Sequence, residues 1–107
     1  MTVEDTKRIL DECLIYNHEI DSLKNELKNA TDDLKPIIKN EITNLTEKVM
    51  YVRCKIDSLS NHNVKLVIRF RFINKMTFKD ISKKLNLSYQ WVNKLYNDGL
   101  EELSKIL

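Results

Sequence analysis

The chain has 107 residues, which is enough for one domain or for a small domain with a helical extension. With one Gly and one Pro, it lacks the turn-forming residues that an all-β fold requires, so the composition predicts long helices. Two cysteines, Cys13 and Cys54, are too few for a disulfide scaffold or a zinc site. The sequence shows neither a signal-peptide pattern at its N-terminus nor an apolar run of the roughly 20 residues needed to span a membrane. We therefore expect a cytosolic protein without a membrane partner.

The net charge of +2 is unevenly distributed along the chain. Residues 1–60 carry nine Lys or Arg and twelve Asp or Glu, which gives −3, whereas residues 61–107 carry nine and four, which gives +5. Between Val64 and Tyr96 there are eight basic side chains and one acid, Asp80. A basic segment of this kind favours binding to a polyanion such as DNA, although a solubilising lysine surface has the same composition.

Residues 1–60 are predicted to form an antiparallel, coiled-coil-like helical hairpin. Apolar residues recur at alternating steps of three and four in two runs, a spacing that places one narrow stripe along each of two helices. The first run comprises Leu10, Cys13, Tyr16, Ile20, Leu23, Leu27, Ala30 and Leu34, and the second comprises Ile38, Ile42, Leu45, Val49, Val52, Ile56 and Leu59. Thr2 and Asp5 have the spacing of a capping box at the start of the first helix. We interpret this half of the chain as a dimerisation or partner-docking element.

The segment 31–36 is the predicted end of the first helix and start of the second. It contains Thr and Asp residues, which are good N-caps, and Pro36, which suits the first turn of a helix. The alternative is one long helix, kinked at Pro36, that pairs with a second chain. In a hairpin Cys13 and Cys54 would lie at the same level, but Cys54 falls off the apolar stripe, so both thiols are expected to remain reduced.

Residues 61–107 are predicted to form a three-helix domain. A polar break at 60–63 precedes a first helix that runs from Val64 to about Ile73. The all-α prediction for the whole chain is thus a helical hairpin, residues 1–60, followed by this domain.

The second and third helices of the domain have the pattern of a helix-turn-helix. Thr77 and Asp80 have the spacing of a capping box at the start of a short helix. Asn86 suits the turn that follows, because Asn tolerates the left-handed backbone conformation better than most residues. Ser88 is a good N-cap for the last helix. Two helices joined by so short a turn make a helix-turn-helix motif.

The second helix of such a motif lies in the major groove of double-stranded DNA with its first turns at the base edges. Gln and Asn side chains can pair with adenine there, and Lys can reach guanine or phosphate. The predicted DNA-binding residues of this helix are Ser88, Tyr89, Gln90, Asn93, Lys94 and Asn97. The preceding helix crosses the DNA backbone, and its predicted phosphate contacts are Lys79, Lys83 and Lys84. Trp91 is expected to seal an edge of the core.

The stretch from Val67 to Leu103 resembles region 4 of sigma-70-type RNA polymerase factors. The resemblance is carried by Arg71-Phe72, Met76-Thr77-Phe78, Asp80-Ile81, Leu85, Leu87-Ser88, Val92 and Leu100-Glu101-Glu102-Leu103, in order and without a gap. The chain departs from the family pattern at Lys75 and Asn86, where Gly is usual, and at Ser82, Trp91 and Gly99. Trp91-Val92 and Gly99-Leu100 are similar to the short sigma-region-4-like regulators of Gram-positive phages and prophages.

The resemblance implies a DNA-binding transcription regulator that also contacts RNA polymerase. The chain lacks any segment like those with which sigma factors recognise and melt the −10 element, so a stand-alone sigma factor is not expected. We expect a homodimer. Two other hypotheses stay open: an adaptor that binds polymerase or a sigma factor with little DNA specificity, and a DNA-packaging adaptor of the phage small-terminase kind. We expect neither an enzyme nor a cofactor, because the sequence shows no nucleophile–base pair, metal-ligand spacing or phosphate-binding Gly loop.

Overall fold

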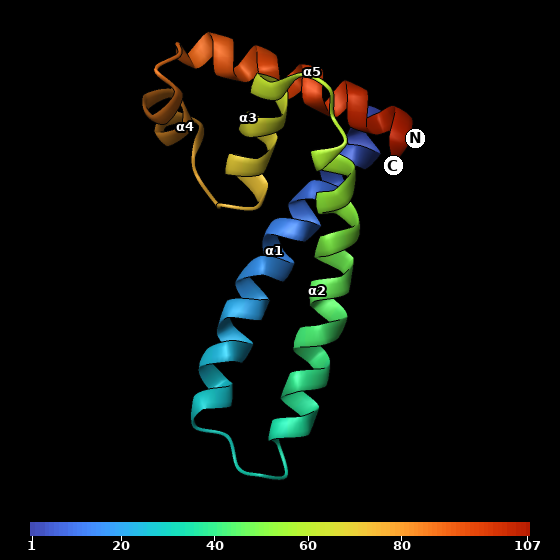
Figure 1. Ribbon diagram of the computed structural model, residues 1–107, viewed down its shortest axis with the longest axis vertical. Helices are drawn as coiled ribbons and strands as arrows, with labels where there is room; N and C mark the ends of the chain where they lie inside the picture. Colours follow the sequence, from blue (N-terminus) through green and yellow to red (C-terminus); the bar gives the residue numbers. More distant parts are fainter.

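The computed structural model describes residues 1–107 as five helices. They are α1 (Val3–Lys28), α2 (Lys35–Asp57), α3 (His62–Phe72), α4 (Phe78–Leu85) and α5 (Tyr89–Ile106). Figure 1 shows α1 and α2 as a long antiparallel hairpin with α3, α4 and α5 at its open end. The predicted all-α fold is confirmed, and the hairpin is formed instead of one kinked helix. None of the five helices combines the length and the hydrophobicity that crossing a membrane requires.

The two hairpin helices begin in different ways. At α1 the capping box forms as predicted: the Asp5 backbone N–H donates to Thr2 Oγ1 at 3.0 Å, and the Thr2 N–H donates to Asp5 Oδ2 at 3.4 Å. At α2 the expectation of a Thr or Asp cap was wrong, because Leu34 holds the cap position without a side-chain hydrogen bond. The backbone N–H groups of Leu34 and Lys35 both donate to the Thr31 carbonyl, so a turn leads directly into the helix. Pro36 lies in the first turn, as predicted.

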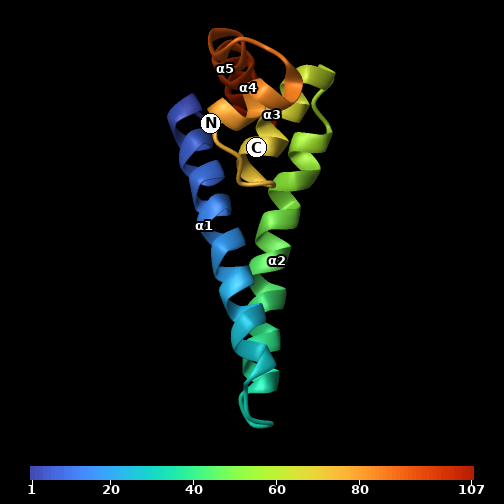
Figure 2. The same ribbon diagram turned by 90° about the vertical axis from the view of Figure 1, so that its left-hand side faces the viewer.

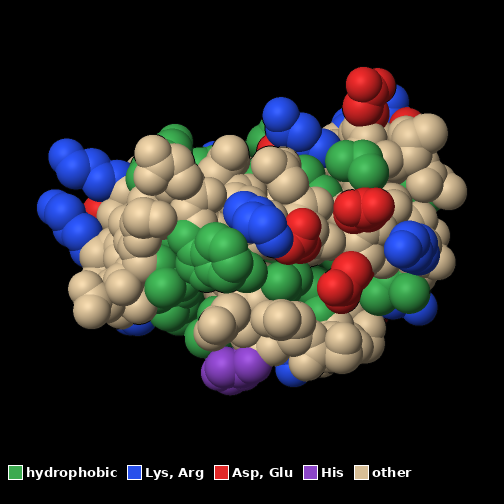
Figure 3. Space-filling model, turned by 90° about the horizontal axis from the view of Figure 1, so that it is seen from above, with side chains coloured by type: hydrophobic (Ala, Val, Ile, Leu, Met, Phe, Trp, Pro, Cys, Tyr) green, Lys and Arg blue, Asp and Glu red, His purple; other side chains and the backbone are tan.

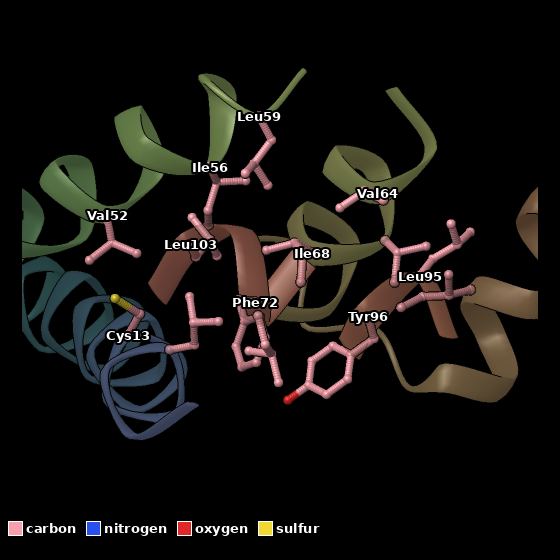
Figure 4. Packing of buried hydrophobic residues seen from close by; sticks show 14 of the residues in the cluster. Cys13, Val52, Ile56, Leu59, Val64, Ile68, Phe72, Leu95, Tyr96 and Leu103 are labelled. Atoms are coloured by element: carbon pink, nitrogen blue, oxygen red, sulfur yellow. The ribbon is translucent and has the colours of Figure 1, made fainter. Parts of the chain in front are cut away.

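The hairpin opens towards the C-terminal helices. In Figure 2, α1 and α2 run close together near their connecting loop and diverge towards the other end, where the C-terminal helices fill the gap. One cluster of buried side chains joins both parts of the chain. From the hairpin it contains Leu10, Cys13, Val52, Ile56 and Leu59, together with residues of α3, α4 and α5. In Figure 4, Leu103 of α5 lies between Ile56 of α2 and Phe72 of α3. The hairpin is therefore part of the core on which the C-terminal helices rest.

Polar contacts also fasten the end of α3 to the hairpin. The Asn17 side-chain amide of α1 donates to the Phe72 carbonyl at 3.0 Å. Lys75, in the turn after α3, forms an ion pair with Asp21 of α1, and this hydrogen bond lowers the pKa of the Asp21 carboxyl. On the α2 side, Arg69 Nε lies 3.7 Å from Asp57 Oδ1. Contacts from both hairpin helices thus orient α3.

The two cysteines are separate reduced thiols. Cys13 is buried in the core, and burial raises the pKa of its thiol to about 11. Cys54 is exposed, as its place off the apolar stripe predicted.

Candidate nucleic-acid interface

The turn between α4 and α5 is held by backbone hydrogen bonds and by one cap at each helix start. Thr77 caps α4, accepting from the Asp80 N–H at 3.2 Å, which is one of the two bonds of the predicted capping box. In the turn, the Leu87 N–H donates to the Ser82 carbonyl at 3.1 Å. Ser88 then caps α5 by accepting from the Trp91 N–H at 3.1 Å. The helix-turn-helix geometry follows from these local interactions.

Two residues of the domain have left-handed backbone conformations: Lys75, with φ of 61°, and Asn86, with φ of 54°. These are the positions at which the sigma-like pattern usually has Gly. The chain keeps the same turns while using residues for which the conformation is more costly. Ser82, which replaces the usual Ala, donates its hydroxyl hydrogen to the Leu87 carbonyl and reinforces the second of these turns.

The relative stability of the Gly and Ala variants at residue 86 tests the conformation of the turn. We expect Asn86→Ala to lower the free energy of unfolding by about 1 kcal/mol, because Ala loses Asn's tolerance of the left-handed region. Asn86→Gly should stay within about 0.5 kcal/mol of the parent, because relief of strain offsets the added freedom of the unfolded chain. Urea unfolding followed by circular dichroism measures both changes.

Lys83, inside α4, is the matched control for residue 86. At this helical position the order should reverse, with Gly less stable than Ala by about 1 kcal/mol. If the Gly and Ala variants had the same order of stability at both positions, a left-handed conformation at Asn86 would be contradicted.

An amide stripe, defined here as Gln90, Asn93 and Asn97, runs along the exposed side of α5. Residues three and four positions apart lie above one another on a helix, so the three side chains face one direction. Tyr89, beside the stripe, has an exposed fraction of 56% and lies edge-on to the Phe78 ring at 6.2 Å between centroids. Inward-facing side chains of α5 belong to the core, so the stripe faces away from the core.

The predicted basic contacts do not all lie together. Lys79, Lys83 and Lys84 are exposed on α4, which packs against α5, and Lys84 Nζ lies 5.4 Å from the centre of the Phe70 ring. Lys94 instead turns towards the other flank of α5. Its Nζ lies 3.4 Å from Asp98 Oδ2 and 5.1 Å from the centre of the Trp91 ring. The amide stripe and the α4 lysines thus stand on two helices that pack together, while the Lys94 ammonium group lies against Asp98 and Trp91.

Trp91 does not seal the core, and the expectation that it would was wrong. Its exposed fraction is 45%, and the neighbouring Val92 occupies the inward position. Trp91, Val64 and Leu95 line an open hollow of about 420 Å³, and Asp98 and other charged residues complete it. The exposed indole gives α5 a second exposed flank that the residue pattern did not reveal.

Charge changes along α5. Its first turns carry Lys94 and no acid, whereas Asp98, Glu101 and Glu102 follow in the second half. Figure 3, the view from above, shows Lys and Arg side chains at the left-hand end, where α4 lies, and acidic side chains gathered in the right-hand half, along the C-terminal part of α5. Only the first half of α5 is therefore suited to a polyanion.

Comparison with known families identifies the C-terminal helices. Residues 61–105 match the family model described as "Sigma-70, region 4". This part of the chain is a sigma-70 region 4-like helix-turn-helix, as the resemblance predicted. Neither curated proteins nor solved structures give a match to the chain.

Proposed function

We propose that the chain is a sequence-specific, DNA-binding transcription regulator of the phage or prophage type. The observation that carries the proposal is the exposed amide stripe of α5, together with the exposed lysines of α4, the helix that packs against it. These side chains are exposed and stand on a sigma-70 region 4-like helix-turn-helix. Helix-turn-helix proteins place this helix in the major groove, with its first turns at the base edges.

The two sets of side chains would have different tasks on DNA. The amide groups of Gln90 and Asn93 can each make two hydrogen bonds to one adenine, which distinguishes it from the other bases. Lys79, Lys83 and Lys84 would contact phosphates, which adds affinity without selecting a sequence. The contribution of Ser88 would be structural, because its hydroxyl oxygen caps α5 and fixes where the helix begins.

The test is alanine substitution at Gln90 and Asn93, with binding measured on selected genomic fragments and on random duplexes. Each substitution should weaken binding to the selected fragments by about 1–3 kcal/mol and leave binding to random DNA nearly unchanged. By contrast, alanine at Lys83 or Lys84 should weaken both alike and reduce the dependence of binding on salt.

Asn25→Ala combined with Asn40→Ala, two exposed amides of the hairpin, is the matched control and should change neither affinity. An equal loss on selected and random DNA after Gln90→Ala and Asn93→Ala would overturn the proposal of base reading.

The exposed Trp91 favours a second candidate function, that of an adaptor that binds RNA polymerase. The hollow beside Trp91 lies on a different flank of α5 from the amide stripe, so a protein contact there would not require DNA. Polymerase capture that is lost in Trp91→Ala but survives Gln90→Ala and Asn93→Ala, without binding to any DNA fragment, would favour the adaptor.

A further inference from the structure

The hairpin carries a groove with both apolar and charged lining on the face opposite α3, which we call the outer groove. Two hollows of about 460 and 290 Å³ follow one another along it. Their apolar lining is Leu23 and Leu45 in one, and Ile9, Cys13, Tyr16, Tyr51 and Val52 in the other. Neither includes a residue of the C-terminal helices, whereas the hollow on the other face of the hairpin includes Ile73.

The two rims of the outer groove carry opposite charges over most of their length. On α1 the rim is Glu12, Glu19 and Glu26, each seven residues from the next, and on α2 it includes Lys48 and Lys55, again seven apart. A seven-residue spacing keeps side chains on one line of a helix in a coiled-coil-like pair. None of these five residues belongs to any ion pair formed within the chain.

The lysines of the α2 rim have aromatic contacts instead. Lys48 Nζ lies 5.3 Å from the centre of the Tyr16 ring, and Lys55 Nζ lies 5.6 Å from that of Tyr51. The first contact fixes the register of the hairpin, because it sets Lys48 at the level of the α1 turn that runs from Tyr16 to Glu19. Lys55, two turns further along α2, is then close to the level of Glu12.

We propose that the outer groove binds a second copy of this chain, with the two hairpins parallel and related by a two-fold axis along their length. This axis places α1 of one copy over α2 of the other at an unchanged level. Glu12 then faces the partner's Lys55, and Glu19 faces the partner's Lys48, each pair occurring twice. The result is a four-helix bundle with the two helix-turn-helix domains on its outer sides, at the same end.

Charge and apolar exposure both favour this arrangement. Two hairpins packed in opposite directions would set the acidic rim of α1 against itself. In a single copy, Tyr51 has an exposed fraction of 58%. In the half of the hairpin near the connecting loop, two helices alone bury little apolar surface. The inference does not depend on the proposed function, because the oligomeric state is measured without DNA.

Charge reversal tests the arrangement in the full chain. Analytical ultracentrifugation at micromolar concentration should show a dimer for the parent protein. The double variants Lys48→Glu/Lys55→Glu and Glu12→Lys/Glu19→Lys should each dimerise at least about tenfold more weakly, because four attractive contacts become repulsive. An equimolar mixture of the two variants should dimerise again, since all four of the reversed contacts are attractive between unlike copies.

Lys7→Glu combined with Lys39→Glu, at exposed positions away from the outer groove, makes the same charge change as the lysine reversal and should leave the dimer intact. Circular dichroism of every variant checks that the helices remain folded. A monomeric parent protein, which is the result expected if a different protein occupies the groove, would overturn the proposal. So would a dimer indifferent to both reversals, or a mixture that stays monomeric.

One contact in the proposed dimer is unfavourable and gives a further test of its direction. Near the loop, Glu26 would face the partner's Glu41, which continues the α2 rim seven residues before Lys48. Glu41→Lys should therefore strengthen dimerisation by about two- to fivefold, the range of one exposed ion pair. A weaker dimer in this variant would exclude the parallel arrangement.

Discussion

Replacing Gly99 with valine is expected to lower the free energy of unfolding by about 3 kcal/mol. Gly99 lies where α5 crosses α3, and a Cβ atom there would be 2.6 Å from Ile68 Cγ1 and 3.1 Å from Val64 Cγ1. Ile68 is fully buried, so it cannot move aside into solvent. Gly99→Ala should cost about 1 kcal/mol, because the gain in helix propensity offsets part of the overlap.

A double-mutant cycle with Ile68→Ala separates this overlap from general damage to the core. Ile68→Ala alone should cost about 2–4 kcal/mol by leaving a cavity. In that background Gly99→Ala should become stabilising, because its methyl group enters the vacated space and the helix-propensity gain remains. Urea unfolding measures all four proteins. If Gly99→Ala stabilised the parent protein as well, α3 and α5 would not be in such close contact.

The second large effect is expected at Leu10, through which α1 joins the common core. Its side chain is fully buried, and Leu10→Ala should lower the free energy of unfolding by about 2–5 kcal/mol. Because the hairpin and the C-terminal helices share one cluster, the loss should appear as one shifted transition for the whole chain. The hairpin and the domain are followed separately by labelling Cys54 on α2 and by the fluorescence of Trp91 on α5.

Ile15→Ala on the same helix is the matched control. Ile15 has an exposed fraction of 55%, so its truncation should change stability by no more than about 0.5 kcal/mol. Two separate transitions in Leu10→Ala, with Trp91 unaffected, would contradict a shared core.

Local pattern was sufficient to predict the helices and the motif. The capping residues Thr2, Thr77 and Ser88 each lie three residues before the backbone N–H that they bond, so the sequence places these helix starts directly. Asn86 in the turn has the left-handed conformation for which its residue type is suited. The exposure of the amide stripe followed from the apolar stripe on the opposite side of α5.

The remaining features depend on contacts between distant residues, which spacing does not encode. Trp91 lines an open hollow with Val64 of α3, and the Lys94 ammonium group lies against Trp91 and Asp98. Lys75 pairs with Asp21, which lies 54 positions away in the chain. Sequence periodicity assigns each helix an inner face but does not give the angle at which helices meet.

The distribution of charge along α5 limits the length of operator that one copy would recognise. In the proposed complex with DNA, Asp98, Glu101 and Glu102 would repel phosphate, so about two turns of helix would enter the groove, a length of about 11 Å. At about 3.4 Å per base pair, that length covers about three base pairs. A sequence of three base pairs recurs by chance throughout any genome. Selective control of a promoter would therefore require two such short sites on the DNA. Their separation would be fixed by the protein that spans them.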